Sequence, residues 1–178
     1  MDNYISDILK GKTNLTQFNQ PEHAGLCLAG EMLIGAYIVC NYARASLEAG
    51  TDAATSKGGP ANREIDALQE KFVRQWAEAK QCWFPNTEQD IKSVFGPMIA
   101  QGAEAKVYYR EGDTSIIKAR TSIYATLGRA LESIVPHNAL FPGVLMHVIG
   151  FTRDTDGQFR AILTQPYIGC RRLATKQK

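Results

Sequence analysis

The segment GAEAKVYYREGDTSIIK, residues 102–118, contains two β-rich runs separated by a polar turn. The runs cover residues 104–109 and 115–119, and the connection at 110–114 is centred on Gly112. Aromatic and β-branched residues favour strands, and a short glycine-containing connection between two such runs is typical of a hairpin. We therefore expect the two runs to pair as antiparallel strands.

The chain after this hairpin alternates between one helical segment and further strands. Residues 122–135 carry an apolar face at helical spacing, whereas residues 144–152 and 158–166 are β-rich. The sequence DTDG at 154–157 is a strong hairpin turn between the last two runs. If residues 97–101 begin the first strand, the order is three strands, one helix and two strands.

The chain before residue 96 has a helical character. Residues 22–49 contain good helix formers and no proline, and the glycine-rich stretch at 50–60 reads as a linker. A further amphipathic helix is predicted to pack on the first one, and a short helix should end at Phe95. The apolar stripe of the amphipathic helix consists of Ile65, Leu68, Phe72, Trp76, Ala79 and Trp83.

These patterns predict an α+β protein in which an N-terminal helical segment precedes a five-stranded antiparallel sheet with one helix. The predicted divisions are a helical segment at 1–95 with a flexible linker near 50–60, a sheet domain at 96–170 and a basic tail at 171–178.

Composition excludes several classes of protein. The chain has 178 residues, 44% hydrophobic and 21% charged, which is typical of a globular protein and not of a disordered one. A net charge of +2 gives no basis for a nucleic-acid partner. The four cysteines and three histidines show no metal-ligand spacing, so free thiols in a reducing cytosol are expected. We find no Ser-His-Asp or Cys-His arrangement that would indicate an enzyme of another type.

The N-terminal residues also argue against a secretory or membrane protein. The sequence MDNYISDILKGK has no basic region before an apolar stretch, so no signal peptide is expected. The longest apolar run, Ala24–Cys40, contains Glu31 and is better explained as a buried helix than as a membrane span. We therefore expect a cytoplasmic protein with no membrane partner.

The residues from Ala100 to Lys118 carry a phosphate-binding pattern. Residues 100–107, AQGAEAKV, fit the glycine-loop spacing G-x-G-x-x-G-x-V, with alanine in place of the first and third glycines. Lys118 ends the sequence SIIK, which stands where kinases have V-A-I-K, and Glu132 lies on the following helix. In kinases this lysine contacts phosphate oxygens, and a helix glutamate holds it through an ion pair.

Residues 97–169 resemble the N-terminal lobe of a protein kinase. More narrowly, they resemble the kinase-like domain of bacterial polyvalent proteins, which are large multidomain proteins of phages and conjugative elements. The motifs that carry the resemblance are GAEAKVYY, SIIKA, ALESIVPHNALFP, VIGFTRD and ILTQPYI. The resemblance would extend upstream through the Trp76 helix and the sequence CWF at 82–84.

This resemblance implies a nucleotide site. Gly102 would be the loop glycine, Lys118 the phosphate contact and Glu132 its ion-pair partner, although Glu104 could compete for the same lysine. Gln165 to Tyr167 would form the hinge that faces adenine. The implied nucleotide-binding residues are Gly102, Ala103, Val107, Lys118, Glu132, Gln165 and Tyr167.

The departures from the kinase pattern limit the expected activity. The sequence contains no HRD and no DFG motif, and only GCRRLATKQK follows the hinge. We therefore expect a truncated kinase-like lobe with no catalytic and no metal-binding residue of its own. ATP and Mg²⁺ would be cofactors only if a C-terminal lobe completed the site. Asp154 and Asp156 would be the first aspartates to test if phosphoryl transfer were observed.

A second hypothesis is a protein-interaction or oligomerisation module in a mobile-element-associated protein. A lobe without its partner exposes apolar surface near Tyr167 and Ile168, where the second lobe would dock. Such a surface would be covered by that missing lobe or by a second copy of the chain.

Overall fold

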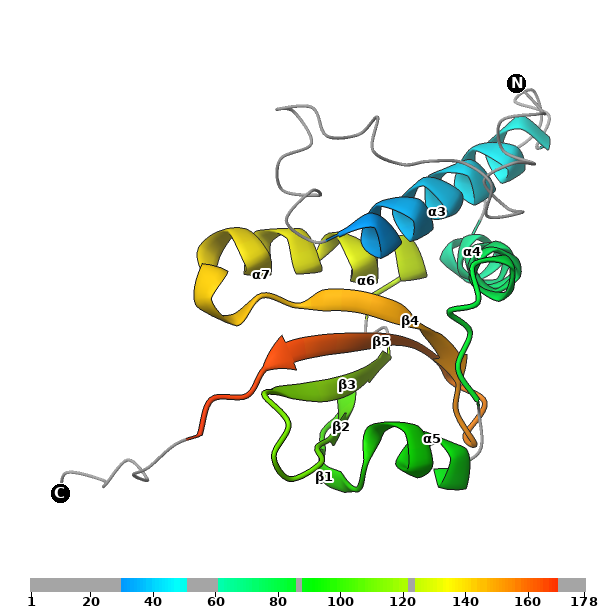
Figure 1. The fold of residues 1–178 in the computed structure, drawn as a ribbon. Helices are drawn as coiled ribbons and strands as arrows, with labels where there is room; N and C mark the ends of the chain where they lie inside the picture. Colours follow the sequence, from blue (N-terminus) through cyan, green and yellow to red (C-terminus); the bar gives the residue numbers. More distant parts are fainter. Residues whose placement is uncertain (1–29, 51–60, 86–87, 122–123, 170–178) are drawn as a thin grey trace, which may run out of the picture.

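The computed structural model describes residues 30–50, 61–85, 88–121 and 124–169 (Figure 1). The beginning of the first predicted helix, the linker residues 51–60 and the tail at 171–178 lie outside these ranges. In chain order the elements are α3 (Glu31–Gly50), α4 (Asn62–Ala79), α5 (Glu88–Phe95), β1 (Met98–Gln101), β2 (Ala105–Tyr108), β3 (Ser115–Thr121), α6 (Leu127–Glu132), α7 (Ile134–Leu140), the 3-10 helix η3 (Pro142–Val144), β4 (His147–Arg153) and β5 (Phe159–Pro166).

The strands form one antiparallel five-stranded sheet in the order β1-β2-β3-β5-β4. This confirms the predicted fold class and both predicted hairpins. Gly112 and Gly157 have φ angles of 93° and 76°, which are conformations that glycine adopts without strain. Both hairpins are therefore favoured by the local conformation of their turn residues.

The helix predicted at 122–135 begins later than expected and is interrupted. The hydroxyl of Thr126 accepts a hydrogen bond from the backbone N–H of Arg129, which starts α6, and the helix breaks at Ser133. Proline lacks an N–H group and clashes with the carbonyl four residues earlier in a continuous helix. The break places Pro136 in the first turn of α7, where the missing N–H is tolerated.

Helices cover both faces of the sheet. Figure 1 shows α3, α6 and α7 on one side and α5 on the other. The larger hydrophobic core joins α3, α4 and α6 to β4 and β5, with Trp76 packed edge-on against Phe151 at a ring-centroid distance of 6.4 Å. A smaller core lies under α5 and includes Phe95, Tyr108 and Ile162.

The buried face of α4 differs from the predicted stripe. The helix packs on α3 as expected, but its buried residues include Gln69 and Val73, whereas Ala79 is exposed. Trp83 lies beyond the end of the helix, because the backbone turns at Gln81 with a φ angle of 58°. The predicted apolar stripe is therefore wrong at its C-terminal end, at Ala79 and Trp83.

The segment from Cys82 to Phe84 lies along the outer edge of β4. The N–H of Phe84 donates to the carbonyl of Phe151 at 2.8 Å, and the N–H of Phe151 donates to the carbonyl of Cys82 at 3.0 Å. The opposite edge, β1, is exposed along its whole length. Among the described helices none is long and apolar enough to cross a membrane.

Candidate nucleotide site

The β2–β3 hairpin brings several predicted site residues onto one face of the sheet. Val107 lies opposite Lys118, Lys118 lies opposite Leu163, and Ile116 lies opposite Gln165. Opposite residues in antiparallel strands share a face, and residues two apart along a strand share it too. One face of the sheet is therefore lined by Val107, Lys118 and Gln165. It is the face on which Leu163 packs against α3, α4 and α6.

Lys118 is half-buried on this face. Within the described ranges its ammonium group makes no hydrogen bond and no ion pair within 4.0 Å. Burial, together with the nearby charge of Arg120, lowers the pKa of Lys118 below its usual value. A cation that is partly removed from water and has no counter-charge is well suited to bind an anionic ligand.

The predicted ion pair between Lys118 and Glu132 is not formed. Glu132 instead accepts hydrogen bonds from Arg129 at 2.9 Å and from the hydroxyl of Tyr37 in α3 at 3.1 Å. The physical reason is the orientation of α6, whose buried side carries Leu131. Successive helix residues differ by about 100° in direction, so the residue after Leu131 turns towards α3.

Glu104, the expected competitor for Lys118, also has another partner. Its carboxylate lies 3.4 Å from the guanidinium of Arg120, and its backbone carbonyl accepts from the N–H of Thr121 at 2.8 Å. Neither of the two predicted carboxylates therefore neutralises Lys118.

The β1–β2 loop leaves its backbone accessible. The N–H of Gly102 donates to the carbonyl of Ala105 at 2.9 Å, which closes the turn, while Gly102 and Ala103 remain exposed. A Cβ atom at Gly102 would have no heavy-atom neighbour within 4 Å. No contact within the protein therefore requires glycine here, and the space above the loop is open to a ligand.

The predicted hinge residues lie at the end of β5. The side-chain amide of Gln165 donates to the carbonyl of Val144 at 3.0 Å, whereas its Oε1 atom is buried and has no hydrogen-bond partner within the described ranges. Tyr167 is exposed and stacks on Tyr109, with ring centroids 4.6 Å apart. The role of both residues in nucleotide binding remains a prediction.

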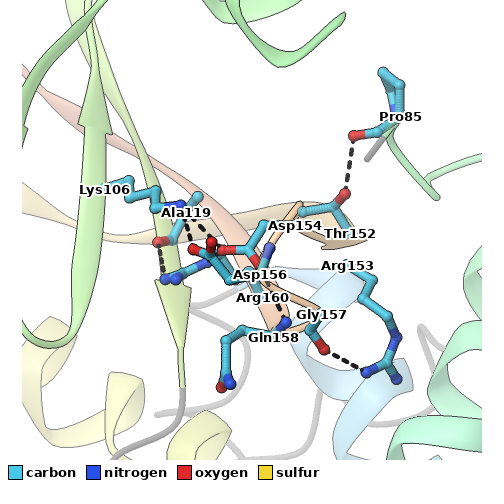
Figure 2. A network of polar contacts seen from close by, with 10 residues as sticks. All are labelled: Pro85, Lys106, Ala119, Thr152, Arg153, Asp154, Asp156, Gly157, Gln158 and Arg160. Carbon is cyan, nitrogen blue, oxygen red and sulfur yellow. Dashed lines mark hydrogen bonds and ion pairs between the residues drawn. The ribbon is translucent and has the colours of Figure 1, made fainter. Parts of the chain in front are cut away.

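The opposite face of the sheet holds a polar network that the sequence analysis did not find (Figure 2). Asp154 accepts hydrogen bonds from Arg160 and, at 3.2 Å, from Lys106, and Asp156 lies 3.0 Å from the same lysine. Lys106 lies opposite Ala119 and therefore points away from the face of Lys118. The only sequence signal was a pair of cationic residues, Lys106 and Arg160, within otherwise apolar strands.

Charge compensation dominates this network. Burial alone would raise the pKa of Asp154, but hydrogen bonds from Arg160, from the backbone of Gln158 and from Lys106 outweigh it and lower the pKa. Burial would likewise lower the pKa of Lys106, but its bonds to Asp156 and Asp154 raise it. A hollow of about 240 Å³ adjoins this network. Asp154 thus anchors the β4–β5 turn, on the face away from Lys118.

Other chemistries find little support in the described ranges. They contain no cluster of three His, Cys, Asp or Glu side chains that could hold a metal ion. Cys40 and Cys82 are buried free thiols. Burial raises the pKa of Cys82 to about 11 and also that of Cys40, so neither supplies a thiolate nucleophile at neutral pH.

Comparison with known families extends this picture. A family model described as "Serine/Threonine/Tyrosine Kinase found in polyvalent proteins" matches residues 66–178, more than half of the chain. Searches of curated proteins and of solved structures gave no match. The matched region includes most of α4 and the whole sheet, so the resemblance extends upstream as expected, whereas α3 precedes it. The chain therefore belongs to the family of kinases found in polyvalent proteins.

Proposed function

We propose that this domain binds a nucleotide weakly on the face of β2 and β3 that carries Lys118, and that it transfers no phosphate by itself. The observation that carries the proposal is Lys118, a half-buried cation on the same face as Val107 and Gln165 that has no counter-charge among the described residues. Phosphate oxygens would supply the missing negative charge, and the backbone around Gly102 is open to them.

The adenine end of the ligand would lie near the end of β5. No group in the described part of the chain donates to the buried Oε1 atom of Gln165, and leaving such an acceptor unpaired costs about 1–3 kcal/mol. A ligand N–H group that reached this atom would recover that energy. The half-buried ring of Tyr109 and the exposed ring of Tyr167 stack on each other next to the same strand end.

Phosphoryl transfer requires groups that these residues do not provide. Kinases use the catalytic aspartate of an HRD motif and the magnesium-binding aspartate of a DFG motif, and this sequence contains neither. ATP and Mg²⁺ remain the proposed cofactors of a completed site, in which Lys118 would contact phosphate. We assign no magnesium ligand to this chain.

A titration with ATP tests the proposal directly. We expect the wild-type chain to bind ATP with a Kd weaker than about 100 μM, because half of a pocket leaves much of the ligand in water. Lys118→Met should weaken binding at least about threefold, as the loss of one ion pair would, with little change in Tm. The matched control is Lys71→Met, an exposed lysine on α4.

Calorimetry or NMR line broadening measures the affinity. Equal weakening by the two substitutions, or no binding at millimolar ATP, would contradict the proposal.

A second candidate function is a protein-interaction or oligomerisation module. Leu140 and Ile168 are 72% and 65% exposed, and Phe141 and Tyr167 are also exposed. Leu140 and Phe141 follow each other along the chain at the end of α7, and Tyr167 and Ile168 follow β5. The ends of α7 and β5 lie on the same side of the molecule in Figure 1, and η3, which follows α7, contacts β5. Exposed apolar side chains that gather in one patch are typical of interaction surfaces.

Light scattering during gel filtration tests this candidate. If a second copy covers the surface, wild type should form a dimer that Leu140→Lys with Ile168→Lys converts to monomer. Val94→Lys, at an exposed apolar position on α5, is the control. A monomer at all concentrations would leave the second lobe as the proposed partner.

A further inference from the structure

Arg120 lies next to Lys118 on the face of the sheet that carries the candidate nucleotide site. The two residues are two positions apart in β3, so their side chains share a face and their Cα atoms lie about 7 Å apart. Arg120 lies opposite Ala105 in β2 and opposite Ala161 in β5. Because both of these neighbours are alanine, the flanking strands leave room on either side of the Arg120 side chain.

The guanidinium of Arg120 has few partners for a group that is largely buried. Its side chain is only 15% exposed, and the guanidinium lies 5.9 Å from the centroid of the Tyr124 ring. Among the described residues it donates one hydrogen bond, to the carboxylate of Glu104 at 3.4 Å. A guanidinium carries five N–H donors, so most of them have no acceptor in the described part of the chain.

Lys118 and Arg120 repel each other across this face. After burial, the charge of Arg120 is the second cause that lowers the pKa of Lys118. The carboxylate that reaches Arg120 is 46% exposed, and exposed ion pairs contribute only about 0–1 kcal/mol to stability. Two adjacent, partly buried cations with so little counter-charge among the described residues are suited to a ligand that carries several negative charges.

Glu104 lies in the β1–β2 loop, above the end of β3 that carries Arg120. Its backbone carbonyl accepts from the N–H of Thr121 at 2.8 Å, which ties the loop backbone to the strand. Its side chain is held less closely, since 3.4 Å exceeds the length of about 2.7–2.9 Å that is typical of a charge-assisted hydrogen bond. The carboxylate can therefore leave the guanidinium while the loop backbone stays in place.

We infer that Arg120 is a second phosphate-binding residue, and that the Glu104 carboxylate occupies it as an internal competitor until a polyphosphate ligand displaces it. Since both cations belong to the nucleotide site proposed above, this role of Arg120 rests on that proposal and specifies a ligand with two or more linked phosphates. A phosphate chain reaches Lys118 and Arg120 together, whereas a single phosphate group engages only one of them fully.

Inorganic tripolyphosphate tests this role without a nucleobase. Its binding to the 178-residue chain is measured by calorimetry in the absence of Mg²⁺, with orthophosphate as the weaker-binding comparison. Glu104→Gln removes the competing carboxylate and should tighten tripolyphosphate binding about threefold or more, whereas Arg120→Gln should weaken it by a similar factor. In the double variant the tightening should disappear, because no guanidinium remains to be released.

Two controls separate a local effect from a change in the net charge of the chain. Glu111→Gln removes a negative charge from the turn at the other end of β2, and Arg63→Gln removes a positive charge from α4; both side chains are exposed. Neither control should change the tripolyphosphate affinity. Because Glu104→Gln keeps Arg120 in place, the test does not depend on whether Arg120→Gln folds.

The role of Arg120 would be overturned if Glu104→Gln tightened binding no more than Glu111→Gln, or if folded Arg120→Gln bound tripolyphosphate as wild type does. It would also be overturned if neither wild type nor Glu104→Gln bound tripolyphosphate at millimolar concentration, or if orthophosphate bound equally well.

These outcomes are distinguishable from those of the proposed function. Tripolyphosphate affinity that responds to Glu104 and Arg120, in a chain that does not bind ATP, would support the role of Arg120 and contradict nucleotide binding. ATP affinity that depends on Lys118 but is unchanged by Glu104→Gln and Arg120→Gln would do the opposite.

Discussion

Asp154 is buried at the start of the β4–β5 turn, where both of its oxygens are occupied. Arg160 and Lys106 donate to Oδ2, while the backbone N–H groups of Asp156 and Gln158 donate to Oδ1 at 3.0 and 2.9 Å. The carboxylate thus neutralises two cations and closes the turn at the same time (Figure 2). Removing its charge would leave Arg160 buried without an anionic partner.

We predict that Asp154→Asn lowers the free energy of unfolding by about 3–5 kcal/mol at pH 7, as expected when one partner of a buried ion pair is removed. The folded pKa of Asp154 lies below its ordinary value of 3.8, so this contribution is complete above that pH and is lost as the pH falls further. The difference between variant and wild type should therefore shrink in acid, as measured by urea unfolding at several pH values. A difference independent of pH would contradict this assignment.

At the candidate site, the sequence predicted the strand that carries Lys118 but not the partner of Glu132. The turn pattern predicted that the strand of Lys118 pairs with the strand of Val107, and the structure places these two residues opposite each other. The partner of Glu132 could not be deduced in this way. It depends on which face of α6 is buried, and α3, with Tyr37, determines that face through contacts distant in sequence.

At the scale of elements, Gly150 allows the 82–84 segment to lie against β4. A Cβ atom at this position would come within 2.2 Å of the carbonyl oxygen of Cys82 and 2.5 Å of the Phe84 ring. We predict that Gly150→Ala lowers the free energy of unfolding by about 1–3 kcal/mol or more, the cost of overpacking. Chemical denaturation measures this loss.

The matched control is Gly102→Ala, because its added methyl group would meet no atom within 4 Å. It should change stability by less than about 0.5 kcal/mol, as most exposed substitutions do. Similar losses in the two variants would show that the close approach at β4 is not what requires glycine.

The sequence predicted the elements whose ends are marked by turn residues. It did not predict features that depend on contacts between residues distant in sequence. Both hairpins follow from glycine turns, and the fold class follows from the order of the runs. The break in the helix after β3 could have been found from Pro136. The burial of Gln69 could not, since periodicity treats glutamine as polar. Gln69 is buried because it satisfies Cys40 and Gly128 on two other helices.

On the scale of the whole molecule, the N-terminal helices and the sheet share one core. Val39 and Trp76 pack in the same cluster as Val148 and Phe151. The family match also begins at residue 66, inside the segment predicted as a separate helical unit. The division at residue 95 remains a prediction, and limited proteolysis of the intact chain would test it.

We predict that the 178-residue chain transfers no phosphate above background when it is incubated with ATP, Mg²⁺ and generic protein substrates. The reason is the lack of the HRD and DFG aspartates, not the altered loop. Glycines introduced at Ala100 and Ala105 should therefore restore nothing in a radiolabel assay. Transfer that depends on Lys118 would contradict this prediction and show that another aspartate has been recruited.

The position of the two tryptophans gives the protein a built-in optical reporter. Trp76 is buried against Phe151, while Trp83 packs against Phe159 with the two rings tilted and lies under the guanidinium of Arg74. Both indoles thus sit where α4 meets β4 and β5, and the sequence contains no other tryptophan. Separation of the helices from the sheet would shift indole emission to longer wavelength as water reaches the rings. Loosening confined to α5 would leave the emission unchanged, so fluorescence distinguishes the two sides of the sheet without a label.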